Sequence, residues 1–178
     1  MHIIDDCIPK LHQDFFENIA LGHIEKGLPW TVKYEATAIE QDVKPISFKH
    51  VLKSDAEISP EFPNFVIVPQ HVSSQLGYIL KDIIFARLFL TVPYKTKLNN
   101  HAPHTDLDYP HTSLIYYVND SDGDTVFFDG DKIVESVTPK KGRCVIFDGL
   151  IPHGAGIPSK GPRCIINYNL HLAEPNGT

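Results

Sequence analysis

The sequence contains few cysteines, and their spacing gives them no common role. Cys7, Cys144 and Cys164 are three in number, lie far apart, and include no CxxC pair. An odd number of widely spaced cysteines argues against a disulfide framework and against a thiolate zinc site. We therefore expect three reduced, buried thiols.

Long hydrophobic runs are also missing. No stretch approaches the roughly 18 apolar residues of a membrane helix, and the first residues, MHIIDDCIPK, lack the basic and apolar regions of a secretion signal. We therefore predict a soluble, cytoplasmic protein without a membrane partner. A chain of 178 residues suffices for one sizeable core, so we expect a single domain over residues 1–178.

An excess of positive charge is absent as well. The chain has 16 Lys and Arg against 22 Asp and Glu, a formal net charge of -6. This balance gives no general attraction to a phosphate backbone, so nucleic acid is an unlikely partner. The C-terminal third is locally basic and suits a small anion better, through Lys140, Lys141, Arg143, Lys160 and Arg163.

Helical spacing of apolar residues occurs only in the N-terminal part of the chain. One pattern, within residues 4–24, predicts an outer helix from the roughly helical spacing of Ile8, Leu11, Phe15, Ile19 and Ile24. A second, within 70–83 and weakened by Gly77, directs toward the core Val72, Leu76, Ile79, Leu80 and Ile83. Short strands are expected at 31–40 and 65–69, and no third helix.

From residue 84 onward the sequence is β-rich. Short apolar runs are separated by the turn signals DSDG, DGD, KKG and SKG, and they occupy 83–94, 111–119, 124–128, 132–139, 142–149 and 163–172. Such spacing favours a double-sheet jelly roll or barrel over a parallel sheet. We predict a mainly β fold with flanking α-helices, in which helices and strands of about 1–83 pack on a β core of about 84–172.

The stretch HAPHTDLDYPHTSLIYYVNDSDGDTVFF, residues 101–128, gathers three histidines and five aspartates. Its His104 and Asp106 form an H-x-D pair, and residues two apart on an extended segment project to the same face. His153, in FDGLIPHGAG, supplies a second imidazole. Two imidazoles and one carboxylate, without a thiolate, form the ligand set of a non-haem Fe(II) site with open positions.

A candidate anion clamp follows ten residues after His153. Arg163 lies on the expected strand RCIINYNLHL, where its guanidinium could hold one carboxylate of a dicarboxylate bidentately. The other end of such a molecule would chelate the metal, and 2-oxoglutarate has this chemistry. The open metal positions would seat that co-substrate together with dioxygen.

The sequence resembles the Fe(II)/2-oxoglutarate-dependent dioxygenases. The resemblance rests on H104-T-D106, H153 and R163 in this order, with SLIYYVND and PKKGRCVIFDGLIPHGAG around them. The resemblance is closest to the prolyl-4-hydroxylase-like branch and covers about the C-terminal half of the chain. It implies a double-stranded β-helix core (jelly roll, cupin-like), with His104, Asp106 and His153 as catalytic iron ligands and Arg163 as the clamp on the C5 carboxylate. It further implies that Tyr117 hydrogen-bonds this carboxylate and that Tyr94 lines the pocket.

The resemblance also implies an activity. It is the oxidative decarboxylation of 2-oxoglutarate to succinate and carbon dioxide, coupled to hydroxylation of a prolyl or other amino-acid or peptidyl side chain. Asp106 favours hydroxylation over halogenation, because a halogenase relative has a small residue there. The R-x-N-x-x-x-R pattern of nucleic-acid demethylases fails, since Ile165 and Asn169 stand at its second and third positions.

Two other functions are compatible with the same residues. One is a non-catalytic cupin-type domain that binds a metal and a small carboxylate, and the other is a cupin-type isomerase or hydrolase, which would leave Arg163 without a role. The substrate, the position of oxidation and the oligomeric state do not follow from the sequence. Residues 35–63 are the expected substrate lid.

Several nearby polar residues are expected to stand outside the ligand set. His101, Asp108 and His111 should be solvated loop residues or residues that orient the ligands, because further ligands would close the site. The run D-S-D-G-D, residues 120–124, lacks the rest of a calcium-binding loop. It predicts a turn.

Overall fold

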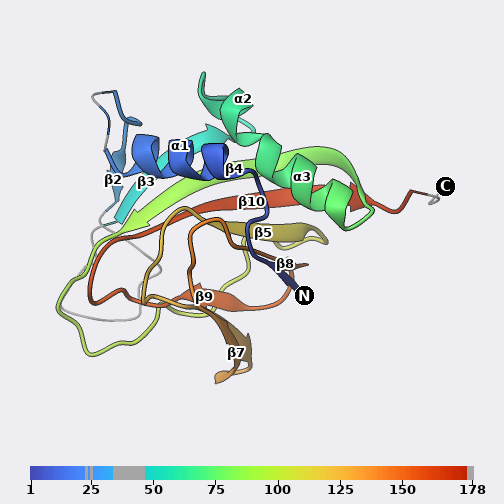
Figure 1. The fold of residues 1–178 in the computed structure, drawn as a ribbon. Helices are drawn as coiled ribbons and strands as arrows, with labels where there is room; N and C mark the ends of the chain where they lie inside the picture. The colour runs from blue at the N-terminus through green and yellow to red at the C-terminus, as the bar shows by residue number, and fades with distance from the viewer. Residues whose placement is uncertain (23, 25, 34–46, 176–178) are drawn as a thin grey trace.

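A computed structural model describes residues 1–22, 24, 26–33 and 47–175, which form two facing antiparallel sheets with helices outside the larger one (Figure 1). The helices are α1 (Lys10–Ala20), α2 (Phe62–Phe65) and α3 (Ile67–Gln75). The strands are β1 (His2–Ile4), β2 (Thr31–Lys33), β3 (Ser47–Lys53), β4 (Ile79–Thr91), β5 (Thr112–Tyr117), β6 (Thr125–Asp129), β7 (Lys132–Val137), β8 (Cys144–Asp148), β9 (His153–Ala155) and β10 (Arg163–Ala173). Of the helices described, none has both the length and the hydropathy to cross a membrane.

The strand order confirms the predicted jelly roll. The larger sheet has seven strands in the order β1-β8-β5-β10-β4-β3-β2, and the smaller has three in the order β7-β6-β9. Every pairing is antiparallel. The N-terminal strands β1, β2 and β3 extend the larger sheet at its two ends, so the N-terminal and C-terminal parts share one sheet.

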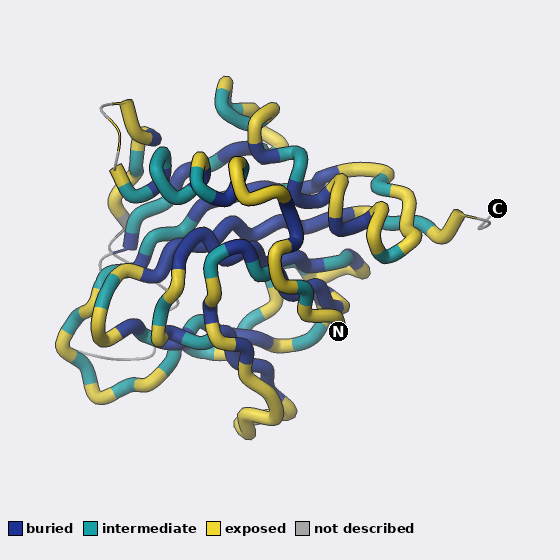
Figure 2. The backbone as a smooth tube through the Cα atoms, viewed as in Figure 1, coloured by how far each residue is buried: buried dark blue, intermediate teal, exposed yellow. Residues whose placement is uncertain are grey.

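The larger sheet is buried on both faces, as the dark central strands in Figure 2 show. Leu114 and Tyr116 of β5 belong to the core beneath the helices, whereas Ile115 and Tyr117 belong to a second cluster against the smaller sheet. Successive side chains of a strand point to opposite faces, so a strand covered on both sides is apolar throughout. This explains the continuous runs SLIYY and CVIF.

Aromatic packing fixes the helices on this sheet. The ring of Phe16 in α1 stacks on Phe65 of α2, with centroids 4.6 Å apart, and meets Tyr116 edge-on at 5.8 Å. The hydroxyl of Tyr168 on β10 donates to the carbonyl of Phe65 at 2.8 Å. The helices therefore contact the same strands that border the smaller sheet on their other face.

Helix α1 confirms the first predicted helix, although its apolar pattern is only partly directed toward the core, on which Ile8 and Ile19 pack. Leu11 is 78% exposed and Phe15 38%, while the buried residues are Gln13, Phe16 and Ala20. The Gln13 side-chain amide donates to the carbonyl of Ile8 at 2.8 Å. Because this bond satisfies a buried polar group, a glutamine can lie on the inner face of the helix.

The second predicted helix was wrong in its C-terminal half. Helix α3 ends at Gln75, and Gly77 has a φ of 77°, a left-handed conformation that ends helices. Ile79, Leu80 and Ile83 lie on strand β4 instead. The strand β4 continues into the apolar run IIFARLFLT. The apparent helical spacing within 70–83 therefore combined residues of two different elements, the end of α3 and the beginning of β4.

The strand expected at 65–69 was also wrong, because these residues lie in α2 and α3. Pro63 stands in the first turn of α2, where proline is compatible with a helix. Strands β1, β3 and β9 were not expected, although the other strands from β4 onward confirm the β-rich interpretation. Of the strand expected at 31–40, Thr31–Lys33 is present, and residues 34–40 lie outside the described part.

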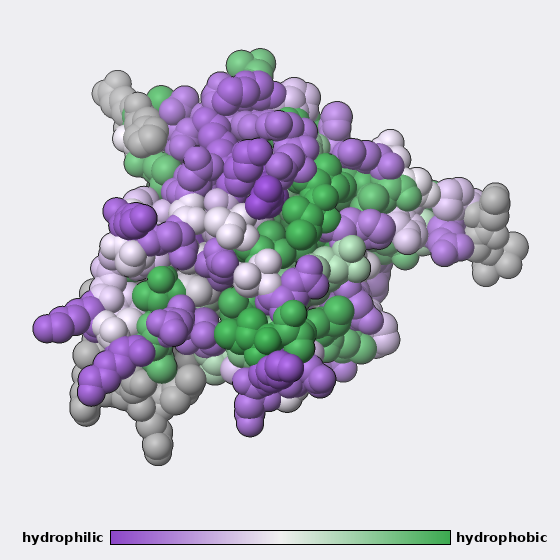
Figure 3. Space-filling model, turned by 60° about the horizontal axis from the view of Figure 1, so that its bottom comes forward, coloured by the Kyte–Doolittle hydropathy of each residue, from purple (hydrophilic) through white to green (hydrophobic). Residues whose placement is uncertain are grey.

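Hydrophobic surface is divided into separate patches on the face that carries β7 and β9 (Figure 3). Exposed apolar residues in the described part include Ile133 and Val134 of β7 and Leu150 before β9. Scattered apolar residues of this kind are usual on protein surfaces.

Replacing Phe16 with alanine should lower the free energy of unfolding by about 3–5 kcal/mol, because a fully buried ring is removed. Leu11→Ala, on the same helix, should change it by less than about 0.5 kcal/mol. Urea denaturation followed by circular dichroism measures both. Equal effects of the two substitutions would contradict the packing of α1.

Candidate functional site

The structure brings the three predicted ligands together. His104, Asp106 and His153 each place one possible ligand atom within 4.8 Å of the others. The backbone N–H of His104 donates to the carbonyl of His153 at 3.0 Å, and the reverse bond is 2.9 Å. The spacing of the two imidazoles, whose centroids are 4.8 Å apart, is therefore set by the main chain.

Local hydrogen bonds orient both imidazoles. Nδ1 of His153 lies 3.0 Å from the carbonyl of Ile151, and Nδ1 of His104 lies 3.3 Å from that of Ala102. A carbonyl only accepts, so Nδ1 is the protonated nitrogen and the Nε2 lone pair is left for a metal. Burial lowers the pKa of His153, which favours the neutral form that binds metals.

The carboxylate of Asp106 is held by side chains of β10. Its Oδ2 accepts hydrogen bonds from the amides of Asn167 at 2.9 Å and Asn169 at 3.0 Å. Burial acts to raise the pKa of Asp106, but these two hydrogen bonds and the nearby cation of Arg87 hold it below the usual value. Asp106 is therefore ionised at neutral pH and can serve as a metal ligand.

Arg163 is a buried cation without an acidic partner. It is 2% exposed, and its Nε and Nη2 donate to the carbonyl of Gly123 at 2.7 Å and to Thr125 Oγ1 at 2.9 Å. No carboxylate of the described residues lies within ion-pair distance of it. Burial lowers the pKa of Arg163, which expresses the cost of an uncompensated buried charge. An anion at this position would remove that cost.

One cavity of about 350 Å³ between the two sheets joins Arg163 to the three candidate ligands. Arg163, Ile165 and Asn167 alternate along β10 on its cavity side. Four residues of strand span about 13 Å, with the guanidinium at one end and the Asp106 contact of Asn167 at the other. The arrangement suits a molecule with a carboxylate at one end and metal-binding oxygens at the other.

The two predicted tyrosines do not reach this cavity. The hydroxyl of Tyr117 donates to Thr125 Oγ1 at 2.8 Å, and burial raises the pKa of Tyr117 to about 12. Thr125, which does line the cavity, accepts from both Tyr117 and Arg163, so its own proton remains to be donated. Tyr94 lines a different hollow, beside Asp122.

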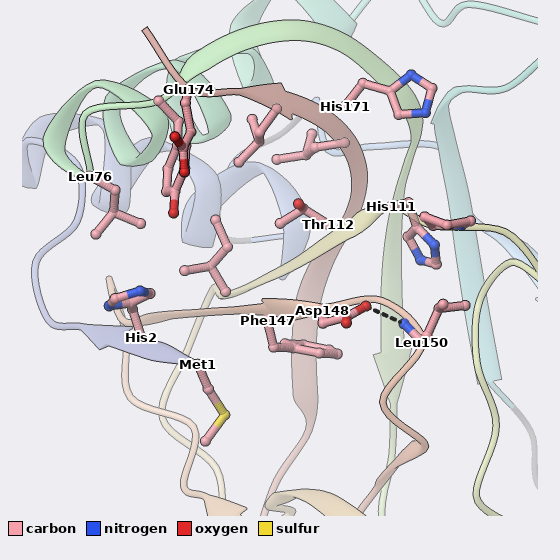
Figure 4. Close-up of a pocket in the computed structure, with 15 residues that line it drawn as sticks. Met1, His2, Leu76, His111, Thr112, Phe147, Asp148, Leu150, His171 and Glu174 are labelled. Carbon is pink, nitrogen blue, oxygen red and sulfur yellow. Dashed lines mark hydrogen bonds between the residues drawn. The ribbon is translucent and has the colours of Figure 1, made fainter. Parts of the chain in front are cut away.

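The neighbouring histidines differ from each other. His101 is 8% exposed and lines the cavity, so it is not the solvated loop residue that we considered. His111 lines a separate pocket of about 640 Å³ (Figure 4). Its Nδ1 lies 2.8 Å from the carbonyl of Tyr109, and its Nε2 lies 3.2 Å from Ser113 Oγ. Its ring nitrogens are therefore occupied away from the candidate ligands.

The remaining polar motifs serve local structure. Asp122 accepts from the backbone N–H of Ser159 at 2.9 Å, consistent with a turn. The basic cluster does not form one anion site, because ion pairs join Lys140 and Arg143 to Asp5, and Lys141 to Asp14 and Glu17. Arg163 is the member of that cluster that lines the cavity.

Sequence reasoning did not single out several polar residues of the cavity and of the ligand contacts, among them Arg87, Thr125, Asn167 and Asn169. The two asparagines could have been found from their spacing, because they follow Arg163 by four and six residues and an even spacing places side chains on the same face of a strand. Arg87 stands out as the single charge in the apolar run IIFARLFLTV. For Thr125 no signal was available, because its part depends on two partners from other strands.

Comparisons with known proteins agree with this geometry. A model of the 2OG-Fe(II) oxygenase superfamily matches residues 91–171, which contain the three candidate ligands and Arg163. No curated protein matches the chain.

Solved structures share the fold at low identity. A prolyl hydroxylase from Trichoplax adhaerens, in complex with a peptide of hypoxia inducible factor, has a TM-score of 0.66 and 13% identity, over 95% of this chain and 82% of that one. A viral collagen prolyl hydroxylase from Paramecium Bursaria Chlorella virus-1 has a TM-score of 0.60 and 15% identity, covering 97% and 95%.

HygX from Streptomyces hygroscopicus, a structure with nickel, 2-oxoglutarate and hygromycin B bound, has a TM-score of 0.62 and 11% identity, covering 99% of this chain and 83% of that one. These likenesses extend over almost the whole chain, including the N-terminal part that the family model does not reach. Residues 91–171 are therefore similar to the 2OG-Fe(II) oxygenase superfamily, and the chain shares its jelly-roll fold with solved prolyl hydroxylases.

Proposed function

We propose that this protein is an Fe(II)- and 2-oxoglutarate-dependent hydroxylase. It converts 2-oxoglutarate to succinate and carbon dioxide while it hydroxylates an amino-acid or peptidyl side chain. The observation that carries the proposal is the position of Arg163, which is buried without a carboxylate partner among the described residues. It lies at one end of a cavity whose other end holds His104, Asp106 and His153. A cytoplasmic location remains a prediction.

The donor set fits ferrous iron. His104, Asp106 and His153 would hold the ion through two imidazole nitrogens and one carboxylate oxygen, a set that leaves positions open for other ligands. When bound, the iron supplies the redox chemistry by which dioxygen oxidises both 2-oxoglutarate and the substrate. The protein contributes a dry, shaped space and a fixed orientation of the ligands.

Arg163 and Thr125 would bind the far carboxylate of 2-oxoglutarate. The guanidinium already donates to Gly123 and Thr125 and has further N–H groups, and the hydroxyl proton of Thr125 is unused. In this arrangement Tyr117 acts through Thr125 and not by direct contact. Phe89 and Ile165, which line the cavity between its ends, exclude water along the carbon chain.

Asn167 and Asn169 would position the Asp106 ligand. Their amides occupy Oδ2 of the carboxylate, and such contacts fix the orientation of a ligand and tune the metal. The carboxylate also fills a coordination position that a halide would otherwise take. This supports hydroxylation as the reaction.

Protein reconstituted anaerobically with Fe(II), then given 2-oxoglutarate and air, should form succinate slowly even without substrate. His104→Ala, Asp106→Ala and His153→Ala should each abolish this turnover, because each removes a metal ligand. His171→Ala, an exposed histidine on β10, is the matched control and should leave it unchanged. Succinate measured by mass spectrometry decides the outcome, and folded ligand variants with wild-type turnover would refute the proposal.

Arg163→Met should weaken 2-oxoglutarate binding at least tenfold while metal affinity stays within a few fold, because the guanidinium contacts the co-substrate and not the metal. Calorimetric titration of the Zn(II)-loaded protein with 2-oxoglutarate measures this without turnover. Unchanged 2-oxoglutarate affinity would place the co-substrate elsewhere.

Asn169→Ala should lower metal affinity by about 10–100-fold, because the Asp106 ligand loses one of its two amide donors. Ser113→Ala is the control, since Ser113 Oγ accepts from Asn169 at 3.3 Å but does not contact Asp106. Competition for Zn(II) against a chelating dye measures both variants. Similar losses in the two would mean that general packing, and not the carboxylate contact, determines affinity.

A further inference from the structure

A second arginine lines the same cavity, at the end that holds the candidate ligands. Arg87 lies on β4 directly across from Asn167 of β10, and its side chain is 25% exposed. Its guanidinium carbon lies 5.3 Å and 5.7 Å from the ring centroids of Phe85 and Phe89. Cation–π contacts of this kind hold the guanidinium in place without using its N–H donors.

The polar contacts of Arg87 are long. Its Nη2 lies 3.5 Å from Asp106 Oδ1 and 3.5 Å from Asn169 Oδ1, whereas charge-assisted hydrogen bonds are usually about 2.7–2.9 Å. Its Nε is buried and has no acceptor among the described residues, and Oδ1 of the facing Asn167 has no donor. A free donor and a free acceptor therefore lie on neighbouring strands.

The charges around the cavity are also unbalanced. Among its described lining residues, two arginines face a single acid, Asp106. In the proposed complex Asp106 coordinates the metal and the two carboxylates of 2-oxoglutarate lie at Arg163 and at the metal, so none of them supplies a close counter-charge to Arg87. Buried charges require a counter-charge, and Arg87 is the more exposed of the two cations.

We infer that the substrate is a free amino acid whose carboxylate binds Arg87. The inference rests on the proposed function and names its substrate class. A residue inside a peptide has no free α-carboxylate, so the site would discriminate against it. The size of the cavity agrees, because about 350 Å³ is at the lower end of the roughly 300–1,000 Å³ of ligand pockets and also accommodates the co-substrate.

The test compares each of the twenty free L-amino acids with its primary amide, which differs only in the carboxylate. Binding to the Zn(II)- and 2-oxoglutarate-loaded protein is followed by saturation-transfer NMR, which requires no turnover. At least one acid should bind more than tenfold tighter than its amide. Arg87→Met should remove this preference, and Arg87→Lys should retain part of it, because the positive charge remains.

Lys53→Met is the matched control, since Lys53 pairs with Asp82 at 2.8 Å and does not line the cavity. It should bind acids as the wild type does. The inference is overturned if no free amino acid binds, if amides bind as tightly as acids, or if Arg87→Met keeps the preference. The affinity for 2-oxoglutarate, measured in the same samples, distinguishes failure of the proposed function from failure of the substrate class. If the wild type does not bind 2-oxoglutarate, the proposed function is wrong. If it binds 2-oxoglutarate but does not prefer acids over amides, only the substrate class is wrong.

Discussion

The alternation of side chains along β4, β5 and β10 is the constraint on which both the core and the cavity depend. In β10, Cys164, Ile166 and Tyr168 pack beneath the helices, while the residues between them face the smaller sheet. A shift of register by one residue would exchange the two sets and bury polar groups in the apolar core. The strand pairing that stabilises the fold therefore also aligns Arg163, the apolar Ile165 and the two asparagines Asn167 and Asn169 along one face of β10.

The cavity contains cations that the protein itself does not neutralise. Arg163 is buried with only neutral acceptors, and Arg87 reaches the one lining carboxylate at 3.5 Å. Such an arrangement costs stability in the absence of ligands, since a buried charge prefers a close partner. Binding of the proposed anionic co-substrate would offset this cost, so part of the stability given up by the fold would become affinity for a dicarboxylate.

Sequence reasoning succeeded where the information is local and failed where partners come from different elements. The H-x-D spacing, the order of His153 and Arg163, and the short strands after residue 84 correspond to features of the structure. The burial of Gln13 in α1 could not be predicted, because its bond to the carbonyl of Ile8 depends on the chain before the helix. The contact of Tyr117 with Thr125 likewise required the smaller sheet to be in place.

The two imidazoles and the carboxylate are fixed by different means. Reciprocal backbone hydrogen bonds join His104 to His153, whereas Asp106 is held by side-chain amides of another strand. A smaller residue at position 106 would therefore leave the imidazole spacing intact and vacate one coordination position bordered by amide donors. This separation makes position 106 the natural place to redesign the site to accept an external anion as its third ligand.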